Sequence, residues 1–85
     1  MDKGKEKILI AEDDPRLTEL IVQKLEKAGY EVFTAANGRD ALAEVNKILP
    51  DLIILDVRMP ELDGFEVKKQ LRSQKLTENI PVIFL

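Results

Sequence analysis

Cysteine and histidine are both absent from this 85-residue sequence. Without cysteine, the chain can form neither a disulfide nor a thiolate metal site. Without histidine, it has no imidazole to act as a general base, a zinc ligand or a phosphoryl carrier. Any chemistry must therefore use carboxylates or the cationic side chains of lysine and arginine.

The sequence also lacks long apolar runs and an excess of positive charge. Its apolar runs are far shorter than the roughly 20 residues that cross a bilayer, and the first residues, MDKGKEK, lack the apolar region of a signal peptide. A net charge of -3 offers no basic face for nucleic acid. The apolar content of 45% is enough for the core of one small domain, and we expect a polar tail at 1–6. Together, these features predict a cytoplasmic domain that binds neither nucleic acid nor a membrane.

Short apolar runs alternate with amphipathic segments along the chain. The runs predict strands at 8–11, 32–35, 52–55 and 82–85. The segments between them predict helices at 15–28, around 41–48, and at 64–73. Asp14 and Pro15 are typical of a helix start, and Asn37-Gly38 is a turn signal. The apolar side chains of the first helix are expected to lie in the core: Leu17, Leu20, Ile21 and Leu25.

This alternation predicts an α/β fold, a doubly wound parallel sheet with helices on both faces. If the first strand is central, the strand order is 2-1-3-4, and right-handed crossovers place the first helix opposite the other two. Such sheets bind ligands beyond the carboxyl ends of the strands at the switch point, here between strands one and three. Those strands end at Glu12-Asp13 and at Asp56, so the three acids are expected to meet in one crevice.

Three carboxylates in one crevice repel each other unless a cation lies among them. Oxygen ligands without nitrogen or sulfur suit Mg²⁺, Mn²⁺ or Ca²⁺, and a few carboxylates completed by water favour Mg²⁺. An aspartate beside Mg²⁺ can also be a nucleophile toward phosphoryl donors. We therefore predict a Mg²⁺ site formed by Glu12, Asp13, Asp56 and the backbone carbonyl of Arg58, whereas Asp14 is explained as a helix cap.

Three segments, KILIAEDDP, LIILDVRMPELDGFEV and PVIFL, resemble the receiver domain of two-component response regulators in order and over nearly the whole chain. The strand-ending aspartate followed by Met-Pro-x-x-Asp-Gly is a highly specific part of this pattern. The resemblance implies a flavodoxin-like fold and phosphoryl transfer from a sensor histidine kinase or phosphotransfer protein. It implies that Asp56 is the phosphoacceptor, that Asp13 binds the metal directly, that Glu12 binds it through water, and that Arg58 supplies the carbonyl.

The resemblance also implies parts that would follow Leu85. These are a serine or threonine after the fourth strand, a fifth strand ending in a lysine, and two further helices. We therefore interpret residues 1–85 as a partial receiver domain in which phosphorylation of Asp56 is impaired. The fourth strand, 82–85, is then an exposed edge that favours a homo-oligomer.

Two other functions remain open from the sequence. A Mg²⁺-dependent phosphatase also places an aspartate nucleophile after a strand, but usually has a second acid two residues later, where this chain has Arg58. Alternatively, the chain is a non-signalling fragment that self-assembles. We expect a signalling module rather than an enzyme.

Overall fold

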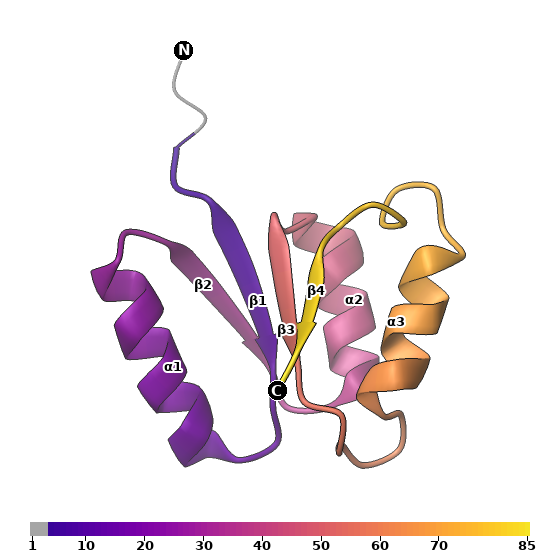
Figure 1. The fold of residues 1–85 in the computed structure, drawn as a ribbon, viewed down its shortest axis with the longest axis horizontal. Helices are drawn as coiled ribbons and strands as arrows, with labels where there is room; N and C mark the ends of the chain where they lie inside the picture. Colours follow the sequence, from indigo (N-terminus) through magenta and orange to yellow (C-terminus); the bar gives the residue numbers. More distant parts are fainter. Residues whose placement is uncertain (1–3) are drawn as a thin grey trace.

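The computed structural model describes residues 4–85, so the first half of the polar tail expected at 1–6 lies outside the described residues. Strands and helices alternate along this part of the chain (Figure 1). They are β1 (Lys7–Ala11), α1 (Pro15–Lys27), β2 (Glu31–Ala35), α2 (Gly38–Ile48), β3 (Leu52–Leu55), α3 (Gly64–Arg72) and β4 (Val82–Phe84). The order predicted from the sequence is confirmed.

The four strands form one parallel sheet in the order β2-β1-β3-β4, which is the order predicted from the sequence. Ala11 at the end of β1 lies opposite Ala35 of β2 and Leu55 of β3. The three strands therefore end at the same edge of the sheet. Residues that directly follow β1 and β3 leave this edge side by side.

Each helix is preceded by a polar residue in extended conformation. The side chains of Asp14, Asn37 and Asp63 accept hydrogen bonds from main-chain N–H groups in the first turns of α1, α2 and α3, which satisfies donors that the helix leaves unpaired. The cap predicted at Asp14 is confirmed. The turn predicted at Asn37-Gly38 is wrong, because Asn37 caps α2 and Gly38 is its first residue. An asparagine oxygen that accepts a nearby N–H serves turns and helix starts equally.

The core lies between the sheet and the layer formed by α2 and α3, which cover one side of the sheet in Figure 1 while α1 lies on the other. Full burial of one such aliphatic side chain stabilises the fold by about 1.5–3 kcal/mol. The buried cluster comprises Leu9, Ala11, Ala35, Ala41, Val45, Ile53, Leu55, Met59, Val67 and Leu71.

Helix α1 contributes much less to the core than its sequence suggests. The prediction that its apolar side chains lie in the core is wrong for Leu17 and Leu20, which are 39% and 58% exposed, whereas Ile21 and Leu25 are half-buried. The helix packs mainly against β2, the strand at the sheet edge. Helical spacing predicts which side chains share a face, but it does not predict whether another element covers that face.

The helices of this fold are short. The longest, α1, has 13 residues, whereas a helix that crosses a bilayer needs about 20 apolar residues. Within residues 4–85, no helix combines the length and apolar character of a membrane span.

Candidate functional site

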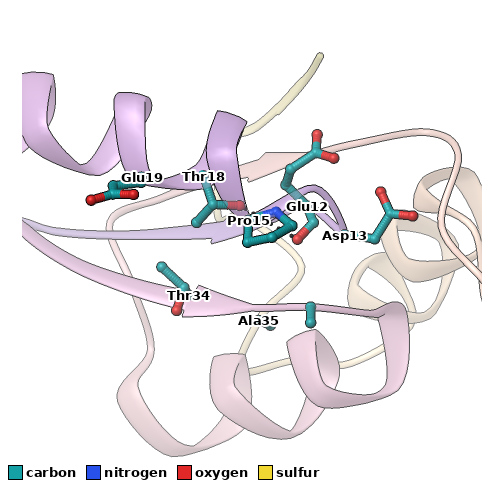
Figure 2. Close-up of a pocket in the computed structure, with 8 residues that line it drawn as sticks. Glu12, Asp13, Pro15, Thr18, Glu19, Thr34 and Ala35 are labelled. Carbon is teal, nitrogen blue, oxygen red and sulfur yellow. Dashed lines mark hydrogen bonds between the residues drawn. The ribbon is translucent and has the colours of Figure 1, made fainter.

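Three carboxylates converge at the carboxyl edge of the sheet. Glu12 and Asp13 follow β1, and Asp56 follows β3. One carboxylate oxygen from each residue lies within 4.8 Å of the other two. Figure 2 shows Glu12 and Asp13 between β1 and the first turn of α1. The structure thus brings together the three acids that the topology was expected to assemble.

Main-chain hydrogen bonds fix the points at which these acids leave the sheet. The N–H of Glu12 donates to the carbonyl of Ala35 at 3.1 Å, and the N–H of Asp56 donates to the carbonyl of Ala11 at 2.8 Å. Both bonds continue the parallel ladder one residue beyond the strands. The main-chain positions of Glu12 and Asp56 are therefore set by the sheet itself.

Glu12 is the most deeply placed of the three acids, with 5% of its surface exposed. Burial raises the pKa of its carboxyl above the usual 4.5, and the nearby Asp13 and Asp56 raise it further. The N–H of Asp14 donates to Glu12 Oε2 at 2.9 Å and partly offsets this rise in pKa. A cation among the three carboxylates would relieve the repulsion that favours the protonated form of Glu12.

Asp56 is half-buried, and the chain that follows it turns back over its carboxylate. The main-chain N–H of Arg58 donates to Asp56 Oδ1 at 3.1 Å, while the Arg58 side chain is exposed. The main chain of Arg58 is therefore adjacent to the acid. The metal-binding role of its carbonyl stays a prediction.

A cavity of about 390 Å³ opens beside Glu12 and Asp13, between α1 and β2 (Figure 2). It is also lined by Pro15, Thr18, Glu19, Thr34, Ala35 and Ala36. The two threonines were not predicted from the sequence. Thr18 lies one turn after the helix cap, and its hydroxyl donates to the carbonyl of Asp14 at 3.1 Å, whereas Thr34 is placed here by its register opposite Ile10.

The ligand atoms suit a small, hard divalent cation. Two ligands on opposite sides of Mg²⁺ are about 4.2 Å apart, because each Mg–O bond is roughly 2.1 Å long. Carboxylate oxygens within 4.8 Å of one another can therefore share one ion after a small side-chain movement, or with one of them bound through water. Chemically, the arrangement can hold Mg²⁺ and present Asp56 as a nucleophile beside it.

Known proteins are similar to this chain over almost all of its length. The family model of the response regulator receiver domain matches residues 8–85. The alkaline phosphatase synthesis transcriptional regulatory protein PhoP of Bacillus subtilis is 47% identical over 79 residues, which make up 93% of this chain and 32% of PhoP. The chain thus spans about a third of the length of that relative.

Solved structures share the fold as well. The chemotaxis response regulator CheY4 of Vibrio cholerae has a TM-score of 0.91 and 40% identity, covering 95% of this chain and 68% of that one. The receiver domain of a sensor histidine kinase from Pseudomonas aeruginosa has a TM-score of 0.90 and 31% identity, covering 95% of this chain and 66% of that one. That protein was solved with a magnesium ion coordinated in its active-site cleft.

Proposed function

The chain belongs to the response regulator receiver domain family, and we propose that it accepts a phosphoryl group on Asp56 with Mg²⁺ held by the neighbouring acids. The observation that carries this proposal is the convergence of Glu12, Asp13 and Asp56, with one oxygen of each within 4.8 Å of the others. It joins an aspartate nucleophile and a cation site in one crevice.

Each residue of the crevice has its own proposed role. Asp13 binds the ion directly, Glu12 binds it through water, and Asp56 and the main-chain carbonyl of Arg58 complete the protein ligands. When bound, Mg²⁺ supplies positive charge against the oxygens of the transferred phosphoryl group. The placement of magnesium in the active-site cleft of the Pseudomonas aeruginosa receiver supports this assignment.

The carboxylate of Asp56 carries out the bond-forming step. One of its oxygens forms a bond to the phosphorus of the donor, while the bond from phosphorus to the donor breaks and its electron pair leaves with the donor. The Arg58 N–H holds Oδ1 of Asp56, which fixes the orientation of the carboxylate for attack by Oδ2. The proposed donor is a sensor histidine kinase or a phosphotransfer protein, so the chain is a substrate of the transfer rather than an enzyme.

Further partners belong to the same proposal. Within residues 4–85, β4 lies at the edge of the sheet, and Ile83 and Leu85 are 52% and 51% exposed. An exposed apolar edge strand can pair with another chain, so we propose a homo-oligomer formed through β4. The name of PhoP describes a transcriptional regulator. For this chain, we propose a cytoplasmic module that does not itself contact nucleic acid or a membrane.

A phosphoryl mimic tests the proposed site directly. We expect beryllofluoride with Mg²⁺ to shift the amide resonances of Glu12, Asp13 and Asp56, because the mimic occupies the phosphoryl position on the acceptor. Asp56→Asn should abolish these shifts. The matched control is Asp51→Asn, five residues earlier, where the amide oxygen can still accept the Lys7 N–H that Asp51 Oδ2 now accepts at 2.8 Å. Equal shifts in the parent and Asp56→Asn would refute the assignment.

A further inference from the structure

The loop between β3 and α3, residues 56–63, closes tightly against the start of α3. The N–H of Gly64 donates to the carbonyl of Val57 at 3.0 Å. A Cβ atom on Gly64 would lie 2.6 Å from the carbonyl oxygen of Asp56, closer than such atoms approach. The first residue of α3 therefore lies directly against the main chain of the proposed acceptor.

The far end of the same loop rests on a different glycine, Gly38, the first residue of α2. A Cβ atom on Gly38 would overlap the carbonyl oxygen of Leu62, and it would lie 2.9 Å from both Leu62 Cβ and Val67 Cγ2. Gly38 itself is buried. The loop thus packs on bare backbone of a helix that lies far away in the sequence.

The loop tip that touches Gly38 is a constrained turn. Glu61 has a φ of 69°, a left-handed conformation that is unfavourable for a residue with a side chain. The N–H of Leu62 donates to the carbonyl of Pro60 at 2.7 Å. Such a conformation persists where the surroundings hold it.

A second contact of α2 with this tip is an ion pair from Arg39 Nε to Glu61 Oε1 at 3.6 Å, with side chains that are 78% and 63% exposed. Solvent screens a pair as exposed as this, so it contributes little. The packing of Leu62 on the backbone of Gly38 is therefore the stronger constraint.

A shift of the tip is transmitted toward Asp56 through a stiff segment. Pro60 has a fixed φ, and it restricts the preceding Met59 to extended conformations. Met59 is buried in the core cluster, and Arg58 directly precedes it. Movement of Leu62 away from α2 thus displaces the main chain of Arg58, which donates to the Asp56 carboxylate.

We infer that Gly38 is a positioning residue for the phosphoryl site: its lack of a side chain lets the loop tip pack on α2, which sets the position of Arg58 beside Asp56. The inference rests on the proposed function. It predicts that adding a single methyl group at Gly38, outside the acidic crevice, weakens Mg²⁺ binding within it.

The test compares two neighbouring substitutions in α2. The backbone of Gly38 is not left-handed, and alanine is preferred to glycine within a helix, so Gly38→Ala adds only the obstructing Cβ. Asn37→Ala removes the helix cap and destabilises the start of α2, but adds nothing that faces Leu62. We expect Gly38→Ala to weaken Mg²⁺ binding by about tenfold to a hundredfold, as for lost supporting contacts of a metal site. Asn37→Ala should keep the parent affinity.

Amide shifts of Glu12, Asp13 and Asp56 during a Mg²⁺ titration give these affinities. Parent affinity in Gly38→Ala would overturn the inference and leave the proposed function intact. Equal weakening in both variants would also overturn it, since helix stability would then be the cause. A parent without Mg²⁺-dependent shifts would refute the proposed function together with the inference.

A second measurement uses the unaltered chain, so it holds even if Gly38→Ala does not fold. Mg²⁺ should shift the amide resonance of Gly38, because the loop tip that packs on it is joined to Arg58. The amide of Ile48, at the other end of α2, is the internal control and should not move. An unchanged Gly38 resonance at saturating Mg²⁺ would contradict the coupling.

Discussion

Neutralising Asp56 should stabilise the protein when no divalent cation is present. In the parent, one oxygen of Asp56 lies within 4.8 Å of oxygens of Glu12 and of Asp13. At 4.8 Å, two unit charges repel by about 0.9 kcal/mol in a water-like dielectric, so removing both interactions gains about 1.7 kcal/mol. The water-like value applies because Asp13 is exposed and Asp56 is only half-buried, and the repulsion is stronger around the buried Glu12.

Part of this gain is lost to a weaker hydrogen bond. Asp56 Oδ1 accepts the N–H of Arg58 at 3.1 Å, and an asparagine oxygen can accept the same N–H without the charge that strengthens the bond. A loss of about 0.5 kcal/mol is reasonable for such a bond. The net expectation for Asp56→Asn is an increase of about 1 kcal/mol in the free energy of unfolding, or roughly 4–8 °C in Tm for a domain of this size.

Urea unfolding followed by circular dichroism, in EDTA at low salt and pH 7, measures this difference. Asp51→Asn, which lies just before the amino end of β3, should show no increase in the free energy of unfolding. Higher salt should reduce the difference, because it screens exposed charges. With Mg²⁺ the order should reverse, since the parent gains binding energy that the variant has lost. An Asp56→Asn variant that is no more stable than the parent in EDTA would refute the electrostatic reasoning.

The remaining predictions concern pH, the core and the sheet edge. The pKa of Glu12 is raised in the fold, so its contribution to stability is full below the unfolded pKa of about 4.5 and is lost as pH rises through the folded pKa. In EDTA, the free energy of unfolding of the parent should therefore fall relative to that of Glu12→Gln between acid and neutral pH. Parallel pH profiles from urea unfolding would contradict this. Leu71→Ala should lower the free energy of unfolding by about 2–5 kcal/mol, because Leu71 is fully buried. Leu20→Ala should lower it by under about 1 kcal/mol, because Leu20 is 58% exposed. Equal unfolding midpoints for the two variants would mean that α1 is packed differently. Ile83→Lys should shift any oligomer toward monomer in light scattering, because it places charge on the exposed edge strand, and a parent that stays monomeric at high micromolar concentration would rule out oligomers through β4.

Much of the fold follows from patterns that the sequence carries locally. Alternating strands and helices imply a parallel sheet, and the strand order places the ends of β1 and β3 together. Glu12, Asp13 and Asp56 could therefore be assigned to one crevice from the sequence, because Glu12-Asp13 and Asp56 follow predicted strands. The receiver family and its flavodoxin-like fold, predicted from the motif around Asp56, are confirmed.

Other features depend on contacts between distant segments, which local patterns do not encode. The apolar stripe of α1 was expected to be buried, yet Leu17 and Leu20 are exposed, because spacing alone does not reveal what covers a face. The packing of Leu62 on Gly38 joins the loop before α3 to the first residue of α2, with most of α2 and all of β3 between them in the sequence. A glycine after an asparagine indicates only a turn or a helix start. Thr34 enters the cavity through strand register alone.

The central claim is that Asp56 accepts a phosphoryl group in a Mg²⁺-dependent reaction. The most direct measurement incubates the chain with a small phosphoryl donor, with and without Mg²⁺, and maps the added phosphoryl group by mass spectrometry of peptides. We predict slow labelling on the peptide that contains Asp56, dependent on Mg²⁺, lost in Asp56→Asn and retained in Asp51→Asn. Labelling that persists in Asp56→Asn, or that proceeds equally in EDTA, would contradict the account.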